Sequence, residues 1–177
     1  EKILKKNVLV VGAGIKTGLN IRIDNPAQLG SDLVVDSVAA IVEYPAPLLI
    51  FDLGTANTVC VIDKNKNYIG GMIYPGIGVS LDSLTAHASQ LGGISIEAPE
   101  HMIGKNTTEC MKSGLIYSSA AAMDGIIDRL QEQLGGEATV IATGGLAKKI
   151  VPHCRREIIL DDDLLLKGLA IIYKKNR

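Results

Sequence analysis

The sequence predicts an α/β protein in which a three-stranded antiparallel meander is joined by parallel strands and flanked by helices. Two observations support this fold class. Three short apolar runs follow one another from residue 48 with only tight turns between them, which is typical of antiparallel hairpins. A long helical pattern then leads into one more apolar run and a final helix. The chain has 177 residues, and 47% of them are hydrophobic, which is enough for a substantial core.

Composition excludes several classes of function. The net charge is −1, and the chain has no Trp and one Phe, so it offers neither a basic surface nor a stacking platform for nucleic acid. The apolar run at 8–11 is far too short for a signal peptide or a membrane span. Three widely separated cysteines show no metal-binding spacing. We therefore expect buried free thiols and a cytoplasmic location, with no nucleic-acid or membrane partner.

The first 46 residues are expected to form the end of a first half-domain and the helix that joins it to a second half-domain. An apolar run at 7–11 predicts a short buried strand, ended by Gly12-Ala13-Gly14. Residues 31–44 predict a helix with Ser31 or Asp32 near its N-cap, ended by prolines. We place a domain boundary there, between 1–46 and 47–177. The chain opens almost directly on a strand-like run with no initiator Met, so we expect it to be part of a longer protein.

The second half is expected to contain the meander and most of the helices. The long helix has a separate line of small residues (Gly114, Ser118, Ala121 and Gly125) that permits close helix packing. Its expected apolar side consists of Met111, Leu115, Ala122, Met123, Ile126, Leu130 and Leu134. The final helix has acidic residues before it and lysines in its last turn, as the helix dipole favours. The expected strands are 48–53, 58–62, 68–74 and 138–143, and the expected helices are 78–91, 107–134 and 162–175.

A candidate phosphate-binding turn follows the first strand of the meander, at Asp52-Leu53-Gly54-Thr55-Ala56-Asn57-Thr58. The bare glycine allows backbone N–H groups to approach a phosphate, and the hydroxyl groups can donate to its oxygens. The carboxylate of Asp52 can hold a cation. An ordinary hairpin turn capped by an Asp explains the same residues equally well.

Two further turns have the same character. Ala142-Thr143-Gly144-Gly145 follows a buried strand, and its glycines would let a flat adenine lie against the backbone, although a tight strand-to-helix turn also accounts for them. Gly30-Ser31-Asp32 opens a helix, where a carboxylate could accept a proton from an attacking hydroxyl or could simply cap the helix. Two Gly/Thr turns that each follow a buried strand resemble the superfamily of acetate and sugar kinases, heat-shock ATPases and actin. Members of it clamp ATP between two ribonuclease H-like halves, and the element order from residue 48 suits one such half.

Within that superfamily, several colinear motifs make the chain similar to the type III pantothenate kinases. Gly30-Ser31-Asp32 resembles the Gly-x-Asp-Arg element of that family, and the turn that begins at Asp52 resembles its second phosphate motif. The other matching segments are Gly14-Ile15-Lys16-Thr17-Gly18-Leu19, Asp24-Asn25-Pro26, Ile103-Gly104-Lys105-Asn106-Thr107, Met111-Lys112-Ser113-Gly114, Asp124-Gly125-Ile126-Ile127, Ala142-Thr143-Gly144-Gly145-Leu146-Ala147 and Leu166-Lys167-Gly168-Leu169.

The resemblance implies a ribonuclease H-like (actin-like ATPase) fold and the phosphorylation of pantothenate by ATP, the entry step of coenzyme A synthesis. It also implies a cytoplasmic homodimer, a monovalent cation (potassium or ammonium) and a divalent cation such as magnesium with ATP. Asp32 would be the general base and Asp52 the monovalent-cation ligand. The implied ATP contacts are Gly54, Thr55, Thr58, Thr143, Gly144 and Gly145, and the implied substrate contacts are Gly30, Ser31, Asp32, Leu33 and Ala88.

The sequence departs from the family pattern in four places. Leu33 stands where the family has Arg, Ala88 lies where it has Thr, and Asn57 replaces the first Thr after the Ala of the second phosphate motif. The N-terminal phosphate motif (Asp-x-Gly-Asn-Thr-Asn) is absent, so we expect the chain alone to lack kinase activity. The alternative to a pantothenate kinase is a divergent relative with a nucleotide-binding or regulatory role, for example as a transcription accessory factor. A third possibility, another phosphotransferase of the superfamily, matches fewer of the motifs.

Overall fold

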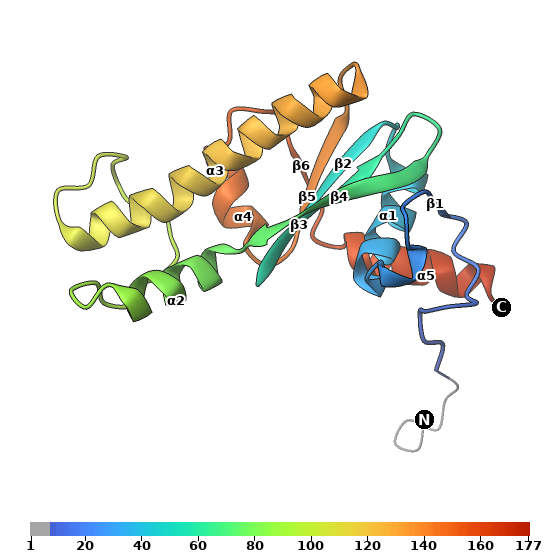
Figure 1. The fold of residues 1–177 in the computed structure, drawn as a ribbon, viewed down its shortest axis with the longest axis horizontal. Coiled ribbons are helices and arrows are strands. Elements are labelled where there is room, and N and C mark those ends of the chain that lie inside the picture. Colours follow the sequence, from blue (N-terminus) through green and yellow to red (C-terminus); the bar gives the residue numbers. More distant parts are fainter. Residues whose placement is uncertain (1–7) are drawn as a thin grey trace.

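The computed structural model describes residues 8–177, which form one mixed sheet with helices packed on both faces (Figure 1). The meander of β2, β3 and β4 is antiparallel, while β5 pairs with β2 in parallel and β6 pairs with β5 in parallel. The strand order is β1-β4-β3-β2-β5-β6. The strands are β1 (Asn20–Ile21), β2 (Leu48–Leu53), β3 (Ala56–Ile62), β4 (Asn67–Pro75), β5 (Thr139–Thr143) and β6 (Ile159–Leu160).

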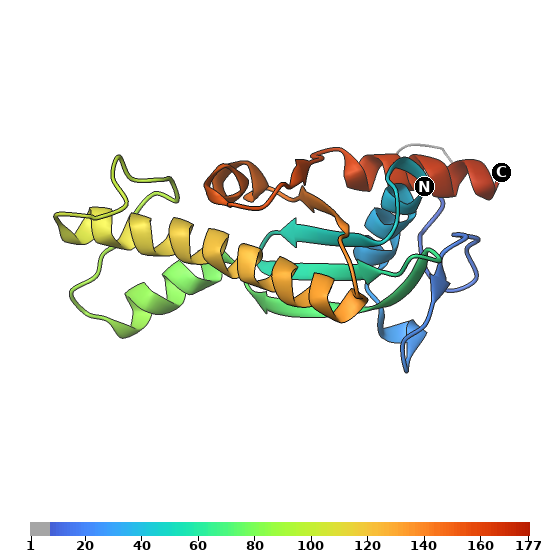
Figure 2. The ribbon, with the colours of Figure 1, turned by 90° about the horizontal axis from the view of Figure 1, so that it is seen from above.

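The helices divide between the two faces of the sheet. The α1 and α5 helices pack against each other at one end of the molecule, and α3 covers the opposite face (Figure 1). The α2 helix and the N-terminal half of α3 extend away from the sheet (Figure 2). The helices are α1 (Ser31–Glu43), α2 (Ile77–His87), α3 (Thr107–Leu134), α4 (Ala147–Ile150) and α5 (Leu164–Lys175), with 3₁₀ turns at Pro26–Gln28 and Val151–His153.

The central strand β2 is buried on both faces, as its uninterrupted apolar sequence predicts. Leu49 and Phe51 belong to the core cluster beneath α3, together with Ile116 and Met123 of that helix. The alternate residue Ile50 belongs to the cluster beneath α1 and α5. Because successive side chains of a strand point to opposite faces, β2 connects the two cores of the sheet.

Most of the predicted elements are confirmed within a few residues, with two differences in the helices. The α2 helix ends at His87, four residues before the expected end. The buried line of α3 runs through Ile116, Ala120 and Ile127, whereas Ala122 of the predicted apolar side is exposed. At 28 residues, α3 is about 42 Å long and extends past the sheet, so one face cannot stay buried along its whole length. Among the described residues, no helix is long and apolar enough to cross a membrane.

The predicted strand at 7–11 is wrong where the structure describes it. Val8 and Val10 are 52% and 74% exposed and belong to no strand, while residue 7 lies outside the described part. The strand that joins the sheet from this region is instead Asn20–Ile21, which pairs with β4 in parallel. A short apolar run specifies a strand only when it meets a sheet edge with free hydrogen-bonding groups, and sequence pattern does not show which run does.

The prediction of buried thiols is correct for Cys60 alone. Cys154 is half-buried, and Cys110 is exposed near the start of α3. The exposure of Cys110 follows from the position of that first turn, which lies on the part of α3 that extends beyond the sheet. All three cysteines are free, as expected.

The contact between α1 and α5 depends on Gly168. A methyl group added there would lie 2.1 Å from the carbonyl oxygen of Val35, so the two helices touch through backbone. Gly168→Ala should therefore destabilise the protein by about 1–3 kcal/mol, as overpacking of a core does. Gly114→Ala is the matched control, because an added methyl there meets nothing within 4 Å and should stabilise α3 by about 0.5–1 kcal/mol. Urea unfolding of both variants measures the difference, and equal stabilities would contradict the close packing.

Candidate active site

Three polar side chains form a row across the sheet at the carboxyl ends of β2 and β5. Asp52 of β2 lies opposite Thr58 of β3 on one side and opposite Thr143 of β5 on the other. They share the face covered by α1 and α5, since the alternate residues Ile50 and Ile141 belong to that core cluster. Ligands of open α/β sheets bind outside the carboxyl ends of parallel strands, which is where this row ends.

The α1 helix brings a second group of carboxyls to the same place. Its N-cap is Gly30, so Ser31 and Asp32 are the first two helical residues, next to the cap as predicted, and no side chain of the described residues caps the helix. Asp32 consequently lies in the first turn with an exposed side chain. Asp36 follows four residues later, on the same side of the helix, and is 2% exposed.

These residues line one cavity of about 280 Å³. The cavity brings Asp32 of α1 together with the glycine turn after β5, which lies more than a hundred residues later in the chain. The N-terminal turns of α1 and α5 both border it, and the positive ends of helix dipoles favour anionic groups such as phosphate. The lining residues are Asp32, Asp36, Asp52, Thr143, Gly144, Gly145, Asp162 and Leu165.

The glycine turn after β5 is shaped by Asp52. Gly144 has a φ of +93°, which favours glycine, and a methyl group there would lie 2.3 Å from Asp52 Oδ1. A methyl group at Gly145 would meet nothing within 4 Å, so the bare backbone of this residue faces open space. The turn can therefore present its backbone to a flat or anionic ligand.

Asp36, Asp162 and Leu165 line the cavity but were missed by the sequence interpretation, and Asp36 is the most deeply buried carboxyl among them. Burial, followed by the charges of Asp52, Asp32 and Asp161, raises the pKa of its carboxyl from 3.8 to about 7. Its Oδ1 atom is buried and accepts no hydrogen bond from the described residues. A charged residue type within the apolar run of α1, one turn after Asp32, was the signal that could have identified it.

The other carboxyls near the cavity differ in their partners. Burial and the charge of Asp32 raise the pKa of the Asp52 carboxyl. Burial alone would raise the pKa of Asp161, but hydrogen bonds from Lys167 (2.7 Å) and Tyr44 (2.7 Å) hold it below its usual value. Asp162 forms an ion pair with Lys148 at 2.6 Å. Asp161 thus ties α5 to the end of α1, while Asp36 and Asp52 have no cationic partner among these lysines.

The remaining predicted site residues lie outside this cavity. Gly54 and Thr55 form the β2–β3 turn, where the Thr55 carbonyl accepts the N–H of Gly76. Leu33 is half-buried and packs against the core cluster under α1. Ala88 lines a separate open hollow at the end of α2. The structure therefore unites the predicted base, the cation ligand and the second glycine turn, but not the two departures on the substrate side.

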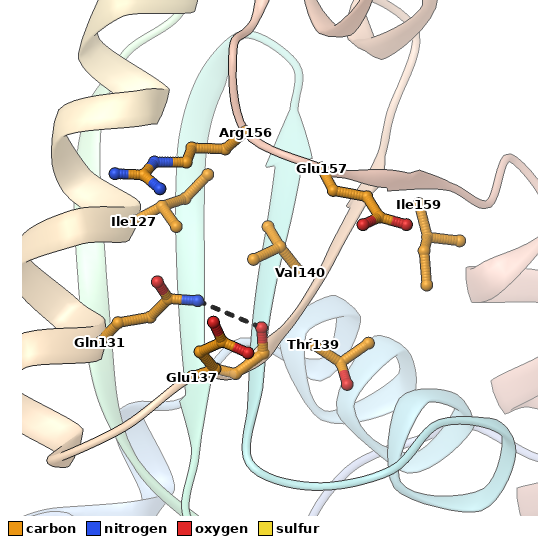
Figure 3. Close-up of a pocket in the computed structure, with 9 residues that line it drawn as sticks. Ile127, Gln131, Glu137, Thr139, Val140, Arg156, Glu157 and Ile159 are labelled. Carbon is orange, nitrogen blue, oxygen red and sulfur yellow. Dashed lines mark hydrogen bonds between the residues drawn. The ribbon is translucent and has the colours of Figure 1, made fainter.

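Another hollow, of about 340 Å³, lies between α3 and the start of β5 (Figure 3). Gln131 spans part of it by donating a hydrogen bond to the carbonyl of Ala138 at 3.3 Å. None of the predicted catalytic, substrate, ATP or cation residues lines it, and it borders the opposite end of β5 from the glycine turn.

Comparison with known proteins identifies the family. A model of the type III pantothenate kinase family matches residues 1–129. The type III pantothenate kinase of Bacillus cytotoxicus is 46% identical over 176 residues, which cover 99% of this chain and 67% of that protein. Across three such relatives, the chain spans about two thirds of the relative's length (66–67%).

Two solved structures share the fold at low sequence identity. A Campylobacter jejuni protein assigned to the Baf family of transcriptional activators has a TM-score of 0.59 at 22% identity, over 90% of this chain and 70% of that one. Component A of the (R)-2-hydroxyglutaryl-CoA dehydratase of Acidaminococcus fermentans has a TM-score of 0.50 at 16% identity, over 82% and 68%.

The sheet order and the solved structures define the fold as that of the actin-like ATPases, a ribonuclease H-like sheet, with a cavity at the carboxyl ends of β2 and β5. Within this class, the chain belongs to the type III pantothenate kinase family. Members of that family are kinases that phosphorylate pantothenate with ATP.

The raised pKa of Asp36 predicts a pH dependence of stability. A folded-state pKa near 7, above the ordinary 3.8, means that protonation of Asp36 favours the folded protein. This contribution is complete below about pH 4 and is lost as the pH rises toward 7. The free energy of unfolding of Asp36→Asn should therefore rise relative to that of wild type over this interval. The rise should be a few kcal/mol, since one pKa unit corresponds to about 1.4 kcal/mol.

Urea unfolding of both proteins across this pH range, in the presence of EDTA, measures this difference in the free energy of unfolding. The exposed Asp82→Asn serves as the control, because the difference between it and wild type should stay small throughout. A difference between Asp36→Asn and wild type that does not change with pH would contradict the assignment.

Proposed function

We propose that this chain carries the catalytic base and one side of the nucleotide site of a pantothenate kinase. The reaction is the ATP-dependent phosphorylation of pantothenate to 4'-phosphopantothenate, the first step of coenzyme A biosynthesis. Family membership supports this reaction. The observation that carries the proposal is the cavity shared by Asp32, Asp52 and Thr143, from three separate elements.

The cavity suits phosphoryl transfer, which depends mainly on positioning and charge stabilisation. Asp32 has an exposed carboxyl at the mouth of α1, where it can orient the primary hydroxyl of pantothenate and accept its proton. The N-terminal turns of α1 and α5 direct their positive dipole ends toward the phosphates. The open backbone at Gly145 offers a surface for the nucleotide, beside the hydroxyl of Thr143.

The same residues suit the cations that the reaction needs. Asp52 is the proposed ligand of a monovalent cation, potassium or ammonium, and its half-buried carboxyl lies beside the glycine turn. A divalent cation such as magnesium would accompany ATP, and carboxyl oxygens are the ligand type that it prefers. Such a cation screens the negative charge of the phosphates from the surrounding carboxylates.

The substrate contacts proposed for Gly30, Ser31, Leu33 and Ala88, and the ATP contacts proposed for Gly54, Thr55 and Thr58, derive from the family motifs. A cytoplasmic homodimer is proposed on the same basis. The small-residue line of α3 is available for a subunit contact, since Gly114, Ser118 and Ala121 are exposed.

A regulatory role without kinase activity is the second candidate. The likeness to a Baf-family structure at 22% identity concerns the fold alone. The relatives at 46–48% identity are type III pantothenate kinases, and Asp32 and Asp52 are both retained in the cavity. The kinase is therefore the favoured function.

Asp32→Asn tests the role of the base, because Asn keeps the size of the side chain and removes its basicity. The assay is pantothenate-dependent ADP release by a protein that combines this chain with the remaining third of the family's length. Turnover should fall by about 10²–10⁴-fold with little change in ATP affinity. The exposed Glu132→Gln on α3 is the control and should keep wild-type turnover. Unchanged turnover in Asp32→Asn would exclude it as the base.

A further inference from the structure

The turn between β2 and β3 is held by backbone hydrogen bonds on two sides. The Leu53 carbonyl accepts the N–H of Leu146 at 3.1 Å, and the Thr55 carbonyl accepts the N–H of Gly76 at 3.0 Å. The N–H groups of Gly54 and Thr55 donate to no backbone carbonyl among residues 8–177. The carbonyls of the turn are therefore engaged with the protein, while two consecutive N–H groups at its tip are available to an anionic ligand.

Gly76 approaches this turn more closely than any side chain would allow. It is the buried N-cap of α2, and a methyl group added to it would lie 2.1 Å from the carbonyl oxygen of Gly54 and 2.6 Å from that of Thr55. Both oxygens belong to the backbone, so no side-chain rotation could relieve the overlap. The φ of Gly76 is −73°, which any residue can adopt, so glycine is required here for space alone.

The helix side of this contact is fixed, and the turn side can move. Ile77, the first residue of α2, is 2% exposed and belongs to the core cluster beneath α3. Leu81, four residues later on the same side of the helix, is buried as well. Thr55, at the tip of the turn, is exposed. A side chain at Gly76 would therefore displace the turn and leave α2 in place.

We propose that Gly76 is a positioning residue for the phosphates of ATP. Its backbone fixes the Thr55 carbonyl and thereby directs the N–H groups of Gly54 and Thr55 toward the nucleotide. This inference rests on the proposed kinase function and on the ATP contacts proposed for that turn. Because Gly76 acts through the turn and not on the reacting atoms, its replacement should change ATP binding and not the chemical step.

Gly76→Ala tests this role in the longer protein that combines this chain with the remaining third of the family's length. KM for ATP should rise about 10–100-fold, as the loss of a hydrogen bond to a charged group predicts. The kcat at saturating ATP and the KM for pantothenate should stay within about twofold of wild type, since binding is lost equally from ground state and transition state. Gly78→Ala is the matched control on the same helix, because a methyl group there meets nothing within 4 Å, and it should keep wild-type constants.

The division between KM and kcat separates positioning from a merely structural role. Partial unfolding lowers the amount of active enzyme and hence the apparent kcat, but it leaves KM for ATP unchanged. Gly76→Ala that loses kcat with an unchanged KM for ATP would therefore overturn the proposal. Calorimetric titration with a non-hydrolysable ATP analogue, without pantothenate, gives a second reading, and wild-type affinity in Gly76→Ala would overturn it equally.

Two further arms keep the test decisive. If circular dichroism shows that Gly76→Ala does not fold, Pro75→Gly takes its place, since it frees the chain before Gly76, adds no atom to the contact and alters an exposed residue. It should weaken binding of the analogue, and unchanged affinity would overturn the proposal. Wild type that binds the analogue but does not phosphorylate pantothenate would refute the proposed function and leave this inference intact, whereas wild type that binds no analogue would overturn both.

Discussion

The packing of α1 against α5 above the central strand determines where every group of the site lies. Gly168 lets the backbone of α5 touch Val35, and this contact fixes the depth at which α1 lies over β2. Asp36 is the next residue after Val35, so the same contact places its carboxyl against the cavity. The ion pairs of Lys167 with Glu43 and Asp161 then hold α5 to the end of α1 and to the loop that follows β6. A shift of α1 by one turn would separate Asp32 from Asp52.

This arrangement concentrates negative charge where a kinase must bind a polyanion, and the structure divides that charge into two kinds. Asp161 and Asp162 are paired with lysines, which makes them part of the scaffold. Asp32, Asp36 and Asp52 have no such partner among residues 8–177, and burial together with mutual repulsion raises the pKa of Asp36 and of Asp52. Unpaired carboxyls that repel one another are costly to the fold and are retained most readily where a cation or a reacting proton compensates them.

The sequence predicted the meander, the long helix and the two glycine turns because each has a local signal in strand periodicity, apolar spacing or turn chemistry. It did not predict that Asp36 belongs to the site, since the residue is distinguished only by what α5 and β2 place around it. The same limit explains why the strand predicted at 7–11 is wrong over residues 8–11: whether a short apolar run forms a strand depends on a free sheet edge far away in the sequence. The relation between Asp52 and Gly144 also needs the parallel pairing of β2 with β5, which no local pattern specifies.

Two of the departures from the family pattern, Leu33 and Ala88, lie outside the cavity that holds Asp32, Asp52 and the glycine turn. Leu33 packs into the apolar cluster with Ile41 and Leu48, where an aliphatic side chain is stable and a guanidinium would have to leave the core to reach solvent. Ala88 lies at the end of α2, beside a hollow that shares no residue with the cavity. Neither side chain therefore lines the cavity of the proposed base Asp32 and the proposed cation ligand Asp52, although Leu33 directly follows Asp32 in α1.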